Sequence, residues 1–168
     1  MMRISYLVPS SLRSRAASPS REALLIIVFC FFLQGSSSSL ENKSNQVCFQ
    51  KQCVDVEIAY KEDDLIRGLQ FRESLASKHG MLFVFRESRR QGFWMKDTRF
   101  PLDIIWMDDS RRVTFIAAGA PPCMMDPCPS YVPDKESLYV LEVNAGEAAV
   151  LGVHPGDSAR FQLHENIR

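Results

Sequence analysis

The chain has 168 residues, 46% of them hydrophobic, and its 20 basic and 20 acidic side chains leave no net charge. That length suits one domain. The charge balance offers no basic excess to neutralise phosphates, so nucleic acid is not an expected partner.

Residues 1–35 have the features of a secretory signal peptide. Four arginines precede an eleven-residue apolar run at 23–33, and small polar residues follow it. Spanning a bilayer takes about 20 apolar residues, so we expect cleavage near Gly35 and a periplasmic or extracellular protein without a stable membrane span. The alternative is a membrane anchor that is not cleaved. Cleavage would leave 16 basic and 19 acidic residues, a net charge of −3.

Four cysteines remain after such cleavage, as two C-x4-C pairs: Cys48 with Cys53, and Cys123 with Cys128. An even number in an exported chain predicts two disulfides. Three connectivities are open, and local pairing within each C-x4-C unit is the simplest. The alternative is a four-thiolate zinc site, although we expect neither a metal nor another cofactor.

The predicted domain begins at about residue 47, after a flexible serine-rich linker at 36–46. Residues 54–58 alternate apolar and polar side chains, which predicts a half-buried strand. Three acidic residues at 62–64 suit the positive end of a short helix, and Gly68 would end it.

The rest of the chain predicts mainly short strands. Residues 120–133 carry five prolines and two cysteines and predict a surface loop, because proline donates no ladder hydrogen bond. Residues 145–151 predict a second short helix, and residues 86–91 a turn. The remaining strands are expected at 80–85, 92–96, 103–107, 113–118, 138–143 and 158–163. About seven short strands and two short helices, without regular alternation, predict an α+β, mainly β domain with a compact antiparallel, barrel-like sheet.

Several short motifs occur in a fixed order along this domain. They are Arg67-Gly68-Leu69 with Arg72, Gly80-Met81-Leu82-Phe83, Phe93-Trp94-Met95-Lys96, Thr98, Pro101-Leu102-Asp103, Val140-Leu141-Glu142 and Gly156-Asp157. In this order the chain resembles the domain of unknown function 192 family over about residues 54–163. The resemblance implies a compact, mainly β fold and export in many members, and it supplies no established activity.

The chain departs from the family pattern at three positions. Asp97 stands where the family usually has asparagine, Gln70 where it has methionine, and Leu65 where an arginine is common. Asp97 places a carboxylate beside Lys96, which would weaken an anion site there.

The candidate ligand site is a face made by Trp94, Lys96 and Thr98. Neighbouring residues of a strand point to opposite sides, so these three would share one side. Asp103, if folded back by Pro101, would pair with Lys96 and orient it. Such a face could hold a small polar or anionic ligand. The alternative is structural: Trp94 in the core, and Lys96 in an ion pair with Asp103 or Asp97.

Arg67 and Arg72 are further candidates, because two guanidinium groups around a helix end can bind a carboxylate or phosphate bidentately. The alternative is that Arg67 caps the helix and Arg72 pairs with a nearby acid.

Other chemistries have little support in the sequence. The three histidines are far apart, and neither an H-E-x-x-H nor a G-x-S-x-G motif occurs. Methionines at 81, 95, 107, 124 and 125 allow a copper(I) site, but methionine more often fills a core.

These observations favour a non-catalytic binding module of the cell envelope, with a small polar or anionic ligand or a partner protein at the Trp94, Lys96 and Asp103 face. The alternative is an envelope hydrolase or lyase in which Lys96 and Asp103 transfer protons. It would need a lysine whose pKa is tuned near the working pH. No catalytic residue is assigned.

Overall fold

A computed structural model describes residues 44–164 of the chain. The predicted signal peptide and most of the predicted linker lie outside the described residues, so these two assignments stay predictions. The elements, in chain order, are β1 (Gln46–Phe49), β2 (Gln52–Ala59), α2 (Glu62–Arg67), β3 (His79–Arg89), β4 (Phe93–Trp94), β5 (Leu102–Met107), β6 (Val113–Ala120), β7 (Ser130–Tyr131), β8 (Ser137–Asn144), α3 (Glu147–Val150) and β9 (Ala159–Gln162).

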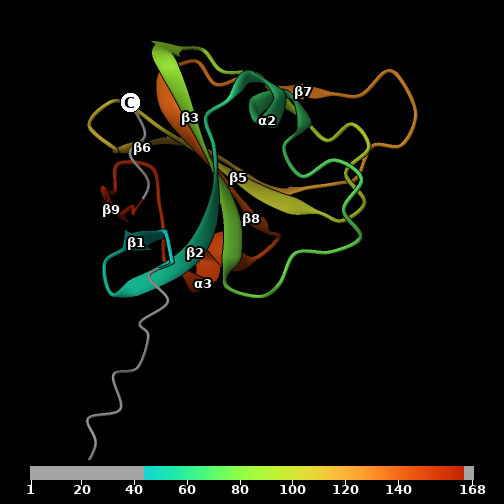
Figure 1. The fold of residues 1–168 in the computed structure, drawn as a ribbon. Helices are drawn as coiled ribbons and strands as arrows, with labels where there is room; N and C mark the ends of the chain where they lie inside the picture. Colours follow the sequence, from blue (N-terminus) through green and yellow to red (C-terminus); the bar gives the residue numbers. More distant parts are fainter. Residues whose placement is uncertain (1–43, 165–168) are drawn as a thin grey trace, which may run out of the picture. The chain divides into compact units, whose positions relative to one another are not determined.

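Seven of these strands form one curled sheet in the order β6-β5-β8-β3-β2-β1-β9, and β4 pairs with β7 in a separate two-stranded sheet (Figure 1). All neighbours in the large sheet are antiparallel except β2 and β3. The predicted fold class, a mainly β α+β domain with a mostly antiparallel barrel-like sheet, is confirmed.

The central strands β5 and β8 and the first half of β3 are largely buried on both faces, which explains their mainly apolar sequences. Side chains alternate across a strand, so odd and even positions of β5 enter two separate cores. Ile105 and Met107 pack in one core, and Ile104 and Trp106 pack in the other. We call them the first core and the second core.

The two helices cover opposite faces of the sheet. Ala148 of α3 lies in the first core, whereas Leu65 of α2 packs against the second. Figure 1 shows α3 beside one end of β8 and α2 near the far end of the sheet. Gly68 caps α2 with φ 49°, a backbone conformation that glycine adopts readily. The second core therefore lies between the sheet and the α2 region, and that is where the candidate site is found.

Four local expectations need correction. β3 continues to Arg89 through the turn predicted at 86–91, with an irregularity in its pairing to β8. β1 forms an unpredicted hairpin with β2. The strand predicted at 92–96 is reduced to Phe93–Trp94, and it pairs with Ser130–Tyr131 inside the loop predicted to be irregular. In each case backbone pairing partners distant in sequence decide the outcome, and local composition does not reveal them.

The structure has local disulfides, Cys48–Cys53 and Cys123–Cys128. The first closes the β1–β2 hairpin, and the second closes the loop before β7. All four thiols are thereby oxidised, so none remains as a thiolate for the zinc alternative. Two disulfides indicate a non-reducing environment.

Candidate functional site

The segment after β4 does not keep the alternation predicted for it. Trp94 is half exposed, Met95 is buried in the second core, and Thr98 is buried as well. Asp97 has φ 55°, in the left-handed region that asparagine and aspartate tolerate best among residues with a side chain. This turn separates Lys96 from Thr98, so Trp94, Lys96 and Thr98 do not form one flat face.

Lys96 is directed to the disulfide loop. Its Nζ donates a hydrogen bond to Asp126 Oδ2 at 2.6 Å, and Asp126 lies between Cys123 and Cys128. That hydrogen bond raises the pKa of Lys96 above its usual value. A general base working at neutral pH needs a lowered pKa, so the raised pKa of Lys96 does not suit the acid–base role that the enzymatic alternative gives it.

Asp103 does not pair with Lys96. Its Oδ1 accepts a hydrogen bond from the Gly119 amide at 2.8 Å. Its Oδ2 accepts from the amides of Gly146 and Ala148, both at 2.9 Å, at the start of α3. Asp103 belongs to the same face of β5 as Ile105, so it points away from the second core and from Trp94. The expected Lys96–Asp103 pair is therefore wrong, and Asp103 is held by backbone amides.

The two arginines also separate. Arg72 makes two hydrogen bonds to the Glu57 carboxylate, at 2.5 and 2.7 Å, as the alternative interpretation expected. This pairing lowers the pKa of Glu57. Arg67 lies at the exposed end of α2, and no acidic side chain among residues 44–164 forms an ion pair with it. Arg67 and Trp94 meet at the same cavity, described next, whereas Lys96, Arg72 and Asp103 do not line it.

This cavity has a volume of about 250 Å³ and lies over Glu142 of β8. We call it the Glu142 pocket. One wall is the end of α2 and the following turn, another is β3, and the third is the segment from Gly92 to Thr98. Its lining residues are Leu65, Ile66, Arg67, Gly68, Leu69, Gln70, Phe83, Phe85, Gly92, Phe93, Trp94, Thr98 and Glu142.

Glu142 is the residue that the sequence analysis missed as a site residue. It is only 5% exposed, and its Oε2 has no hydrogen-bond partner among the described residues. Its neighbours across the sheet are Met81 and Ile104, which are apolar. Burial alone raises the pKa of Glu142 from 4.5 to about 8, because the charged form loses its hydration. The available signal was a single carboxylate inside the apolar run 138–143.

The backbone of Gly68 covers one side of this carboxyl group. A side chain at position 68 would place its Cβ 3.1 Å from Phe83 Cζ and 3.9 Å from Glu142 Oε2. A glycine here therefore lets the turn after α2 approach Glu142 without filling the pocket. Any larger residue would also have to adopt the positive φ of this position.

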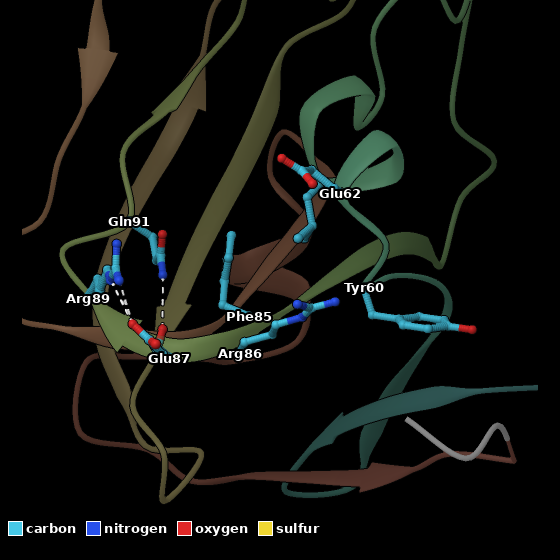
Figure 2. A pocket seen from close by; sticks show the side chains of 8 residues that line it. Tyr60, Glu62, Phe85, Arg86, Glu87, Arg89 and Gln91 are labelled. Atoms are coloured by element: carbon cyan, nitrogen blue, oxygen red, sulfur yellow. Dashed lines mark hydrogen bonds and ion pairs between the residues drawn. The ribbon is translucent and has the colours of Figure 1, made fainter. Parts of the chain in front are cut away.

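A neighbouring cavity of about 390 Å³ shares Leu65 and Phe85 with the Glu142 pocket. Figure 2 shows its charged side chains, which come mainly from the end of β3. There Arg89 is paired with Glu87, and the Gln91 side chain donates to the Glu87 carbonyl. Both members of the ion pair are mostly exposed. Exposed, mutually paired charges are typical of a solvated surface, so this cavity is the weaker candidate.

Comparison with known sequences places the chain in a family. Residues 44–161 match the DUF192 family, described as "Uncharacterized ACR". The chain belongs to the DUF192 family. No curated protein matches it significantly.

Two solved structures of similar proteins share the fold. One is a protein of unknown function from Novosphingobium aromaticivorans DSM 12444, with 34% identity over 70% of this chain and 83% of that one, at a TM-score of 0.63. The other is a Sinorhizobium meliloti 1021 protein provisionally named a transcription regulator, with 32% identity over 70% of this chain and 91% of that one, also at a TM-score of 0.63.

Many motif residues of this DUF192 domain converge on the Glu142 pocket. The pocket is lined by residues 67–69, by Phe83, by Phe93-Trp94, by Thr98 and by Glu142, although these are scattered over 76 positions from first to last. The other motif residues support the fold, as Asp103 does at α3. Residues of the motifs that identify the family thus form the walls and the bottom of the Glu142 pocket.

Metal and membrane sites find no support among residues 44–164. No three histidine, cysteine, aspartate or glutamate side chains gather there as they would around a metal ion. Three of the five methionines considered for copper are buried in the two cores. None of the helices in this part of the chain has the length and apolarity needed to cross a bilayer.

Proposed function

We propose that this DUF192 domain is a binding module of the cell envelope that takes a small ligand with a hydrogen-bond donor into the Glu142 pocket. The carrying observation is the buried carboxyl group of Glu142, which lines the cavity and whose Oε2 has no donor from the described residues. Leaving a buried acceptor unpaired costs about 1–3 kcal/mol. A ligand that supplies the missing donor recovers this cost.

The sequence predicts a small polar or anionic ligand or a partner, and the pocket favours the polar ligand over the anion. Lys96 is the cation expected to orient an anionic group, but it already pairs with Asp126. The pocket instead has a carboxyl group at its base and aromatic side chains in its walls. Pockets of this kind, mostly apolar with a few polar groups, are the usual form of small-molecule sites.

Placement in the envelope rests on two independent features. The disulfides at Cys48–Cys53 and Cys123–Cys128 suit an oxidising compartment. The basic and apolar segment at residues 1–35 has the order of a cleavable signal peptide. Neither feature depends on the pocket, so the location and the ligand can be tested separately.

Binding is favoured over catalysis because the acid–base pair of the enzymatic alternative is not assembled. Asp103 is occupied by three backbone amides, and Lys96 holds its proton more tightly than an ordinary lysine. Glu142 has the raised pKa that acid–base catalysis uses. Among the described residues that line the pocket, however, there is no second carboxyl group and no histidine or cysteine to work with it.

A ligand screen tests the proposal. A library of small polar compounds would be added to the purified protein while its unfolding temperature is followed, since a ligand that binds the native state stabilises it. We expect hits whose stabilising effect is lost in Gly68→Ala, which narrows the pocket, and kept in Glu136→Gln, an exposed change elsewhere. Hits that stabilise both variants equally, or no hits at all, would contradict the proposal.

A further inference from the structure

The polarity of the Glu142 pocket restricts the charge of its ligand. The carboxyl group of Glu142 lies at the bottom of the pocket, and the neighbours of Glu142 on the adjacent strands are apolar. Arg67 is the single basic side chain among the described lining residues, and it lies at the exposed end of α2. A negatively charged ligand group would therefore meet an acid at the bottom of the pocket and would find a cation only at its mouth.

The other cations near this region are engaged elsewhere. Lys96 donates to Asp126, and Arg72 is bound to Glu57 by two hydrogen bonds. None of these groups, nor Asp97, contributes to the raised pKa of Glu142, whose cause is burial alone. The carboxyl group thus lacks a cationic partner within the described residues, and a ligand cation would be the first one close to it.

The walls and the size of the pocket restrict the rest of the ligand. Phe83, Phe93 and Trp94 offer aromatic surface beside the carboxyl group, and aromatic faces attract both apolar groups and cations. Thr98 adds a hydroxyl group that can accept or donate. Since a water molecule occupies roughly 30 Å³ in the liquid, a cavity of about 250 Å³ has room for a compact molecule with a single ring or a short branched chain.

We propose that the ligand of the Glu142 pocket is a small primary amine, bound through its ammonium group to the Glu142 carboxylate and through its apolar part to the aromatic walls. This inference rests on the proposed binding function and specifies its ligand class. An ammonium–carboxylate contact is a charge-assisted hydrogen bond, the strongest type that this pocket can form.

Binding should release a proton. Before binding, Glu142 is mostly protonated at pH 7, because burial raises its pKa to about 8. The ammonium group binds the ionised form, so the carboxylic acid gives its proton to the solvent as the complex forms. With a pKa of about 8, the ionised fraction grows about ninefold from pH 6 to 7 and about fivefold from pH 7 to 8. The affinity should grow by the same factors and level off above pH 8, where Glu142 is already mostly ionised.

Three probes that share a phenylethyl group and differ in their polar end test the charge. 2-Phenylethylamine, 2-phenylethanol and 3-phenylpropanoate would be titrated into the purified protein by calorimetry, in buffers of different ionisation enthalpy. We expect the amine to bind best, with release of close to one proton at pH 7 and an affinity about fivefold higher at pH 8 than at pH 7. Benzylamine and isobutylamine extend the series, in case the phenylethyl group is too long for the pocket.

Two variants assign the effect to Glu142. Glu142→Gln removes the charge and keeps the shape, so it should weaken amine binding at least tenfold and abolish proton release. The matched change Glu136→Gln, at an exposed position, should alter neither. Circular dichroism would verify that both variants are folded.

The remaining outcomes separate this inference from the proposed function. If the alcohol or the carboxylate binds as tightly as the amine, or if screening hits are neutral and no amine binds, the ammonium assignment is wrong while the pocket remains a ligand site. If no amine binds and the screen yields no ligand of this pocket, both proposals fail. Amine binding that persists unchanged in Glu142→Gln would also overturn the inference.

Discussion

At the scale of single residues, Glu142 and Asp103 illustrate two opposite uses of a buried carboxyl group. Asp103 accepts three hydrogen bonds from backbone amides, whereas the Glu142 Oε2 accepts none from the described residues. The two belong to opposite faces of the sheet. A carboxylate with several donors is a stable structural element, and one without them is available to a ligand.

Glu142 should make the protein less stable as the pH rises. In the folded state its pKa is about 8, compared with an ordinary value of 4.5, so folding keeps a proton that the unfolded chain has lost. Its contribution is most favourable below pH 4.5 and declines by about 1.4 kcal/mol per pH unit up to pH 8. We expect Glu142→Gln to be more stable than the natural protein at pH 8 by several kcal/mol, and similar to it at pH 4.

Urea unfolding of both proteins from pH 4 to 9 measures this difference, since the titrations of all other groups largely cancel in the comparison. A parallel pH dependence of the two unfolding free energies would show that Glu142 is ionised in the folded protein.

Asp103 and Lys96 should contribute to stability independently. Asp103→Ala leaves the amides of Gly119, Gly146 and Ala148 without their acceptor, which should cost at least about 3 kcal/mol. Lys96→Met breaks only the pair with Asp126 at the surface of the loop, and should change the stability little.

A double-mutant cycle measures the coupling between the two positions. We expect the effects of Asp103→Ala and Lys96→Met to add, because no contact joins the residues. The matched cycle of Lys96→Met with Asp126→Asn should show the coupling that the first cycle lacks. A large coupling between positions 96 and 103 would be evidence for the pair expected from the sequence and against the arrangement in the structure.

At the scale of elements, the sequence predicts best where one local rule dominates. The continuous apolar run at 80–85 predicts the buried first part of β3, and the acids at 62–64 with Gly68 predict α2. The prediction for the segment around Trp94 is wrong because the conformation of this segment depends on residues that are distant in the sequence. Ser130–Tyr131 pairs with β4, and Cys123 bonds to the backbone of Met95 and Asp97.

The sequence predicts only some residues of the candidate site, because the others are brought there by strand pairing between distant segments. Arg67, Trp94 and Thr98 were identified, and all three line the Glu142 pocket. Glu142 itself was read as part of a buried strand, since one sequence does not show which face of a central strand adjoins a cavity. Lys96 and Asp103 were joined because they are close in the chain, although β5 directs Asp103 to the other side of the sheet.

The Cys123–Cys128 disulfide should fix the segment that follows Trp94. It closes the loop that carries Asp126, while Cys123 exchanges backbone hydrogen bonds with Met95 and Asp97. Replacing both cysteines by serine should lower the unfolding free energy by less than about 3 kcal/mol, because the closed loop is short. It should also speed amide hydrogen exchange at Asp97 and Cys123, which local opening controls.

Replacement of Cys48 and Cys53 by serine is the matched control. That pair closes a loop of the same length in the β1–β2 hairpin. It should leave exchange at Asp97 unchanged. Equal acceleration in both double variants would mean that the disulfides act on the whole domain and not on their own loops.

At the scale of the whole molecule, the disulfides of the domain and the N-terminal segment point to the same location. The oxidised cysteines of the described domain indicate a non-reducing environment. The segment at residues 1–35 has the composition of an export signal. If the segment is an export signal and the cysteines are oxidised outside the cytosol, oxidation depends on export. A block of export should then leave the domain with free thiols.

We therefore predict that the exported protein begins after Gly35 and has no free thiol. Its apolar run of eleven residues is too short to span a bilayer comfortably, and N-terminal sequencing with alkylation and mass spectrometry measures both features.

Leu25→Arg combined with Val28→Arg interrupts the run and should keep the chain inside the cell. There residues 24–33 stay attached and Cys48, Cys53, Cys123 and Cys128 should all be alkylated, because cytosolic thiols are kept reduced. An exported natural protein that retains residues 24–33 would instead establish the membrane-anchored alternative. Disulfides that still form in the retained variant would separate cysteine oxidation from export.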